Sequence, residues 1–166
     1  FRCFSPRLRG ASEYGIMRKN AEARTTFMRI MATDFGDAHT GIAISDPTGF
    51  LAGFTTVINA YRPEVVAEQV AALAKEHGVE ELVLGHPINM DGTRGPRSEK
   101  AQAMKALLEE TTSLPVVLWD ERRTTIDAHQ ILMNSGKNAK KRKKVVDAVA
   151  ATLILEGYLT YKKSRP

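Results

Sequence analysis

Three acidic residues lie where a metal site built on a β-sheet would need them. Asp34 ends a short strand-like run over residues 29–34, and Gly36 just after it permits a turn that brings the backbone close to a ligand. Glu121 follows another strand-like run, and Asp147 lies among small residues in a helical stretch. Carboxylates that converge repel one another unless a cation holds them, and oxygen ligands without thiolates suit Mg²⁺ or Mn²⁺. Two such ions about 4 Å apart can activate water and stabilise the leaving oxygen of a phosphodiester.

This pattern predicts metal-assisted phosphodiester hydrolysis in which Asp34, Glu121 and Asp147 are both the catalytic residues and the metal ligands. Asp34 and Glu121 share one edge of the sheet if their strands are adjacent and parallel. Each residue also has an ordinary structural interpretation. A strand-end Asp is often a turn residue, Glu121 belongs to a charged segment, and Asp147 can pair with Lys143 one helical turn earlier. Spacing alone leaves both interpretations open.

Basic residues near these carboxylates are candidates for binding phosphates. The formal net charge is +5, but six basic and two acidic residues within residues 1–27 supply most of it and leave +1 for the remainder. Clustering is therefore more informative than net charge. We predict substrate contacts from a polar loop, from the residue after Glu121 and from the basic run that precedes Asp147. The predicted substrate-binding residues are Asn89, Arg94, Arg97, Arg122, Lys140, Lys141, Arg142, Lys143 and Lys144.

The elements that must position these residues follow from hydrophobic periodicity. Apolar runs predict five strands, over residues 29–34, 40–45, 54–58, 81–84 and 114–119. Apolar residues at helical spacing predict helices after Pro63, around residues 101–108, over residues 124–133 and from the basic run onward. The order βββαβαβαα predicts an α/β fold, in which an antiparallel meander extended by parallel strands forms a five-stranded mixed sheet with helices on both faces.

Length and composition predict one folded domain over residues 28–166. Residues 1–27 show no periodicity, and we expect them to be a disordered or non-native N-terminal extension before a functional start at Met28. The single cysteine, Cys3, forms neither an intramolecular disulfide nor a thiolate metal site, which fits a reducing, cytoplasmic location. No run of about 18 apolar residues occurs, so we expect no membrane partner.

An ordered set of motifs resembles the YqgF family of pre-16S rRNA nucleases, which are related to the RuvC Holliday-junction resolvases. The motifs, spread from about residue 28 to residue 161, are Asp34-Phe35-Gly36, residues 41–47, Gly85-His86-Pro87, residues 89–92, Asp120-Glu121-Arg122 and residues 146–151. The resemblance implies an RNase H-like fold with the acidic site on Asp34, Glu121 and Asp147, and with Asp120 as a less favoured substitute for Glu121. It also implies the substrate, precursor 16S rRNA, whose 5′ end such a nuclease would mature.

Two residues depart from the family pattern. His86 stands where an aliphatic residue is common, and Arg123 extends the usual Asp-Glu-Arg. Neither departure touches the proposed metal ligands. We expect His86 to pack its ring in a loop, with contact to the substrate or its scissile phosphate as the alternative. We expect His39 to be a solvent-exposed turn residue, with approach to a phosphate as the alternative.

Three other functions remain compatible with the sequence. A Holliday junction resolvase would use the same site on branched DNA and would need a symmetric dimer to cut opposed strands. A non-catalytic RNA- or ribosome-binding module is favoured if the three carboxylates do not converge. An actin-like ATPase needs two such domains around its nucleotide, and this chain has room for one. Structured RNA versus branched DNA, Mg²⁺ versus Mn²⁺, and monomer versus homodimer stay open.

Overall fold

The computed structural model describes residues 28–89, 91–93, 95–120 and 139–164, and for residues 139–145 the backbone alone. The helix predicted over residues 124–133 and the extension predicted over residues 1–27 lie outside these ranges, so both stay predictions.

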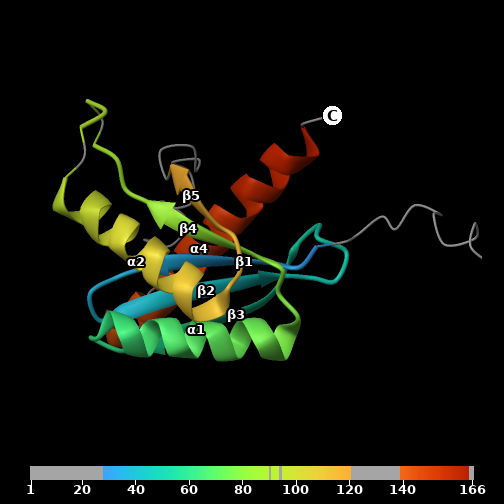
Figure 1. Cartoon of the computed structure of the whole chain (residues 1–166), viewed down its shortest axis with the longest axis horizontal. Helices are drawn as coiled ribbons and strands as arrows, with labels where there is room; N and C mark the ends of the chain where they lie inside the picture. The colour runs from blue at the N-terminus through green and yellow to red at the C-terminus, as the bar shows by residue number, and fades with distance from the viewer. Residues whose placement is uncertain (1–27, 90, 94, 121–138, 165–166) are drawn as a thin grey trace, which may run out of the picture.

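A five-stranded mixed sheet forms the centre of the fold (Figure 1). Its strands are β1 (Ile30–Phe35), β2 (His39–Ser45), β3 (Ala52–Asn59), β4 (Glu81–His86) and β5 (Val116–Asp120). The first three form an antiparallel meander, whereas β4 runs parallel to β1 and β5 runs parallel to β4. The order across the sheet is β3-β2-β1-β4-β5. The predicted mixed sheet is confirmed, and the C-terminal ends of β1, β4 and β5 point to the same edge.

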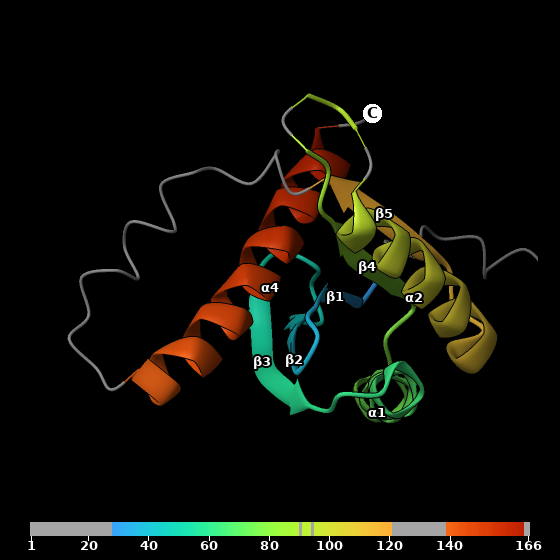
Figure 2. The ribbon, with the colours of Figure 1, turned by 90° about the vertical axis from the view of Figure 1, so that its left-hand side faces the viewer.

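Helices cover both faces of the sheet, as predicted (Figure 2). The two helices α1 (Pro63–His77) and α2 (Pro96–Thr112) pack on one face, and the long helix α4 (Ala139–Lys163) crosses the other. Proline at the first turn favours the start of α1 and α2, since it lacks only an N–H that has no partner there. Gly78 ends α1 in the left-handed conformation with φ of 63°, which glycine adopts without strain.

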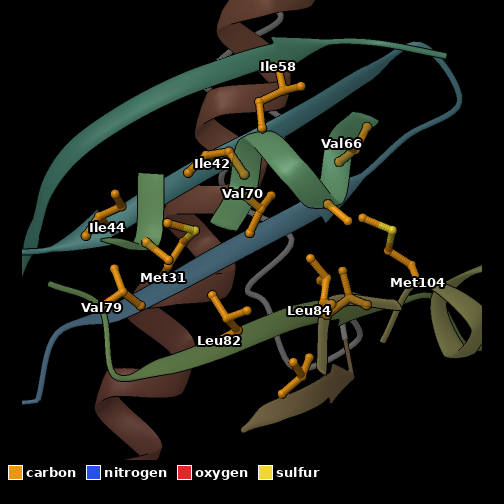
Figure 3. Close-up of a cluster of buried hydrophobic side chains, with 14 residues drawn as sticks. Met31, Ile42, Ile44, Ile58, Val66, Val70, Val79, Leu82, Leu84 and Met104 are labelled. Atoms are coloured by element: carbon orange, nitrogen blue, oxygen red, sulfur yellow. The ribbon is translucent and has the colours of Figure 1, made fainter. Parts of the chain in front are cut away.

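Alternation along the strands separates two hydrophobic cores. The core beneath α1 and α2 contains large side chains, among them Met31, Leu82 and Leu84 from the strands and Met104 from α2 (Figure 3). The core beneath α4 takes the intervening residues, which include Ala32 and Ala43 on β1 and β2. Because successive side chains of a strand point to opposite faces, this division follows directly from the sequence.

The small residues beneath α4 let its backbone approach the sheet closely. A Cβ added to Gly41 of β2 would overlap the backbone oxygen of Asp147, would lie 2.7 Å from the carbonyl carbon of that residue, and would lie 3.3 Å from Cβ of Ala151. At the other end of α4, the Glu81 carboxylate on β4 accepts hydrogen bonds from Tyr158 Oη at 2.9 Å and from Lys162 Nζ at 2.5 Å. Contacts at both ends therefore fix the position of α4 on the sheet.

Two details differ from the expected elements. The fourth strand extends through Gly85 and His86, because these residues pair with Trp119 and Asp120 of β5. His86 is therefore a strand residue, and the expectation of a loop position is wrong. The third strand is also longer than expected, because Ala52 and Asn59 at its two ends both pair with β2. None of the helices in the described part of the chain is long and apolar enough to span a membrane.

Replacing Gly41 by alanine should separate α4 from the sheet. The added methyl group meets backbone atoms that have no freedom to rotate away, so we expect Gly41→Ala to lower the free energy of unfolding by about 3 kcal/mol or more, at the upper end for overpacked cores. Urea unfolding of the purified chain measures the change. Gly95→Ala is the matched control, because its Cβ would meet nothing closer than Asn89 Nδ2 at 3.5 Å. Equal stability of the two variants would contradict the close packing of α4 on Gly41.

Candidate active site

Asp34 and Asp147 line the same cavity, which has a volume of about 310 Å³ and lies at the C-terminal ends of β1 and β4. Asp34 near the end of β1 pairs with Gly41 across the β1–β2 ladder. The backbone carbonyl of Asp147 rests on that same glycine. Gly41 therefore places Asp34 and Asp147, which are far apart in the sequence, at one cavity, and their role as metal ligands stays a prediction.

The carboxylate of Asp147 has an open coordination position. Its Oδ2 atom is buried and has no hydrogen-bond partner among the described residues. A buried polar atom without a partner costs roughly 1–3 kcal/mol, and a cation bound at this oxygen would remove that cost. The described lining of the cavity has three carboxylates, on Asp34, Asp37 and Asp147, and no sulfur ligand, which fits a hard divalent ion such as Mg²⁺ or Mn²⁺.

The third predicted ligand, Glu121, lies outside the described residues. Within the part of the chain that the structure describes, no three His, Cys, Asp or Glu side chains are grouped closely enough to hold a metal ion. Asp120, directly before Glu121, ends β5, but β5 is not adjacent to β1 because β4 lies between them. The three parallel strands still end at one edge, so the intervening strand sets the width of the candidate site.

Two basic side chains from the first turns of α2, Arg97 and Lys100, line the same cavity as the carboxylates. Lys100 Nζ lies 2.5 Å from Asp37 Oδ1, at the tip of the β1–β2 hairpin. The hydrogen bond and the positive charge of Lys100 hold the pKa of Asp37 below its usual 3.8, and Arg97 adds a smaller effect in the same direction. The cavity therefore combines carboxylates on the strand and α4 side with cations on the α2 side.

A buried hydrogen bond connects β4 to the start of α2. His86 Nε2 lies 2.6 Å from Ser98 Oγ, and both residues are buried. Ser98 adjoins Arg97 in the first turn of α2, so this contact fixes the helix end that carries the cavity's basic residues. His86, which departs from the family pattern, is therefore buried in the interior. Its neighbours Gly85 and Pro87 line the cavity.

The tip of the β1–β2 hairpin forms one wall of the cavity. A Cβ on Gly36 would lie 2.5 Å from the backbone oxygen of His39, so glycine is needed there for the hairpin to close. His39 begins β2, lines the cavity and donates from Nδ1 to Asn59 Oδ1 at 2.8 Å. It is therefore a half-buried strand residue beside Asp34, and not the solvent-exposed turn histidine that we expected.

Two motif acids have structural roles outside the cavity. Asp46 accepts hydrogen bonds from the Thr48 hydroxyl and from the backbone N–H of Phe50 at 2.9 Å, and these bonds lower its pKa to about 2. Asp91 accepts from Thr93 in the loop before α2, which lowers its pKa as well. Both carboxylates therefore stabilise turns.

The predicted substrate-binding residues fall into three groups. Arg97 lines the cavity, whereas Asn89 is exposed in the loop before α2 and donates to Thr93 Oγ1 at 2.9 Å. Arg94 and Arg122 lie outside the described residues. Five lie on the α4 backbone before Asp147, and their side chains are not described: Lys140, Lys141, Arg142, Lys143 and Lys144. Sequence reasoning missed Lys100 and Asp37. A signal for Lys100 existed, because it comes three residues after Arg97 and so lies on the same helix face as Arg97.

Comparisons with known proteins identify relatives over most of the chain. A family model described as "RuvX: Holliday junction resolvase" matches residues 28–161. A protein of Halothermothrix orenii named "Putative pre-16S rRNA nuclease" is 44% identical over 135 residues, which are 81% of this chain and 96% of the relative. A protein of Bacillus subtilis with the same name is 43% identical over 134 residues, which are 80% of this chain and 97% of the relative.

Two solved structures share the fold. The structure of Thermus thermophilus RuvC in complex with a Holliday junction substrate has a TM-score of 0.56 at 12% identity, and it covers 84% of this chain and 99% of that one. A second Thermus thermophilus RuvC structure has a TM-score of 0.51 at 14% identity with the same coverage. At these identities the likeness concerns the fold alone, and it confirms the predicted RNase H-like architecture.

Removing the Lys100 ammonium should release the carboxyl of Asp37. In Lys100→Met we expect the pKa of Asp37 to rise toward its usual 3.8, because both main causes of the lowering come from that side chain. Carboxyl chemical shifts followed by NMR between pH 2 and pH 6 measure the titration. Lys105→Met is the control, since Lys105 lies on the same helix but pairs with Glu109. An unchanged Asp37 titration in Lys100→Met would contradict the ion pair at the hairpin tip.

Proposed function

The chain belongs to the RuvX Holliday junction resolvase family, and from that membership we propose that it is a divalent-metal-dependent nuclease that hydrolyses phosphodiester bonds in precursor 16S rRNA. The observation that carries the proposal is the cavity that Asp34 and Asp147 share, which Arg97 and Lys100 from α2 also line. The relatives' printed name supports the choice of substrate.

The charges of the cavity support the proposal of a bound metal ion. Asp34, Asp37 and Asp147 face two cations, and Lys100 is already paired with Asp37. Among the described residues that line the cavity, carboxylates therefore outnumber cationic groups, which disfavours a phosphodiester unless a cation offsets them. We propose that Asp34 and Asp147, with Glu121 as the third ligand, hold Mg²⁺ or Mn²⁺. When bound, the ion polarises the phosphodiester and lowers the pKa of water so that it can attack phosphorus.

The remaining residues would bind and orient the substrate. The Arg97 guanidinium is suited to hold the non-bridging phosphate oxygens, because its planar donors match that geometry. Lys100 is fixed beside it by Asp37 and adds positive charge without entering the metal site. The basic residues on α4, from Lys140 to Lys144, come one to two helical turns before Asp147, where they could contact phosphates on either side of the reacting one.

A resolvase acting on branched DNA is the second candidate function. The description of the matching family favours it, and the same cavity would serve, because RNA and DNA present the same phosphodiester to the ligands. It requires a homodimer that holds two cavities on opposed strands, whereas cleavage of rRNA requires only one.

Cleavage by the full chain distinguishes these functions. With Mg²⁺ or Mn²⁺ we expect hydrolysis of a precursor 16S rRNA 5′-leader fragment and weaker action on a four-way DNA junction. Asp34→Asn and Asp147→Asn should each lower the rate by at least about 100-fold, because each removes a metal ligand. Glu68→Gln, which removes an exposed carboxylate on α1, should keep the rate.

Three outcomes would change the proposal. Selective cutting of the junction would favour the resolvase. RNA binding without cleavage, equal in the wild type and in Asp34→Asn, would favour a binding module. Undiminished cleavage by folded Asp34→Asn and Asp147→Asn would exclude this cavity as the active site.

A further inference from the structure

A second cavity, with a volume of about 390 Å³, adjoins the candidate active site. Both cavities are lined by Phe35, Asp37 and Lys100, so they meet at the hairpin tip and at the Asp37–Lys100 ion pair. The rest of the second cavity comes from the residues that begin α1 and from the middle of α2. A nucleic-acid strand with one phosphate in the first cavity would therefore place its neighbouring nucleotide at the entrance of the second cavity.

The second cavity has mainly apolar walls and an exposed aromatic ring. Phe35, Met104 and Leu107 supply apolar surface, and Tyr61 stands just before α1 with 85% of its surface exposed. An exposed tyrosine beside an apolar cavity provides a flat ring on which another ring can stack. Nucleobases stack on such rings with little regard to their sequence.

The charges of this cavity disfavour a second phosphate. Its carboxylates, on Asp37 and Glu64, outnumber its one ammonium group, on Lys100, which lies at the junction with the first cavity. Arg62 lies 3.6 Å from Glu64, but both side chains are exposed, so water weakens this pair. An uncharged ring that carries N–H donors suits these carboxylates, whereas Lys100 suits the phosphate between the two cavities.

We propose that the second cavity binds a nucleobase of the substrate strand, from the nucleotide next to the reacting phosphodiester, with Tyr61 as its stacking surface. The proposal rests on the proposed function, because it takes the first cavity as the place of the phosphodiester. It also defines the substrate class. The nucleotide beside the cleaved bond must be unpaired, since extracting a base from an intact duplex costs a few kcal/mol.

A fluorescent base analogue tests this site directly. Oligoribonucleotides with a duplex and a single-stranded overhang carry 2-aminopurine at one position at a time, and a blunt duplex of the same sequence serves as the reference. Binding is measured with EDTA present, so that no cleavage is required. DNA versions of the same oligonucleotides show whether the site distinguishes the two sugars.

We expect 2-aminopurine fluorescence to fall at one overhang position when the wild-type chain binds. Tyr61→Ala should abolish that quenching and weaken overhang binding roughly 5- to 150-fold, whereas Tyr61→Phe should keep both. Blunt-duplex binding should not change in either variant. Phe50→Ala is the matched control, because Phe50 is also an exposed aromatic residue but lies in the β2–β3 connection, at the opposite end of β2 from the cavities.

The outcomes separate this site from the proposed nuclease activity. Tyr61-dependent quenching without cleavage by any metal would leave the nucleobase site in place and overturn the nuclease. Metal-dependent cleavage with unchanged quenching and overhang binding in Tyr61→Ala would overturn the nucleobase site alone. Quenching that is lost equally in Phe50→Ala would also overturn it, because the effect would then not be local to the cavity.

Discussion

The approach of α4 to Gly41 is the contact on which the candidate site depends. Asp34 lies opposite Gly41 in the β1–β2 ladder. The backbone of Asp147, on α4, contacts the same glycine from the face of the sheet that α4 covers. Any side chain at this position would push the helix outward and would separate the two carboxylates. The small residues around it, such as Ala43 and Ala151, extend the same close packing along the helix. A backbone contact without side chains therefore sets the geometry of a charged site.

The α2 side of the cavity is held in place by contacts between side chains. The buried hydrogen bond between His86 and Ser98 anchors the first turn of α2, and the Asp37–Lys100 pair connects that helix to the hairpin tip. Both contacts restrain the α2 end that carries Arg97 and Lys100. The described side chains that line the cavity include three carboxylates and two cationic groups, a balance that supports the proposal of a divalent cation there.

Local sequence patterns predicted much of the fold because alternation and helical spacing are local properties. The strand runs, Pro63 at the start of α1 and Gly78 at its end all carry direct signals. The position of β4 between β1 and β5 carries no such signal, because strand order depends on contacts between distant segments. The strand position of His86 also lacks a local signal, because it depends on pairing with Asp120 of β5.

Asp34, Asp147 and Arg97 were predicted from motif and residue type, whereas Lys100 and His39 enter the cavity through α2 packing and hairpin closure. Tyr61 has no motif at all, and its significance comes from a cavity that two helices form together. Residue types thus led to the proposed chemistry, and long-range packing determines which further side chains line the cavity.

Anomalous diffraction from crystals of the chain soaked in Mn²⁺ tests the central claim most directly. The account predicts an anomalous peak in the first cavity, roughly 2.0–2.6 Å from carboxylate oxygens of both Asp34 and Asp147. Its disappearance in Asp147→Asn crystals that keep α4 on Gly41 would show that the ion depends on this carboxylate. Strong Mn²⁺ peaks elsewhere, with the two carboxylates uncoordinated, would contradict the account.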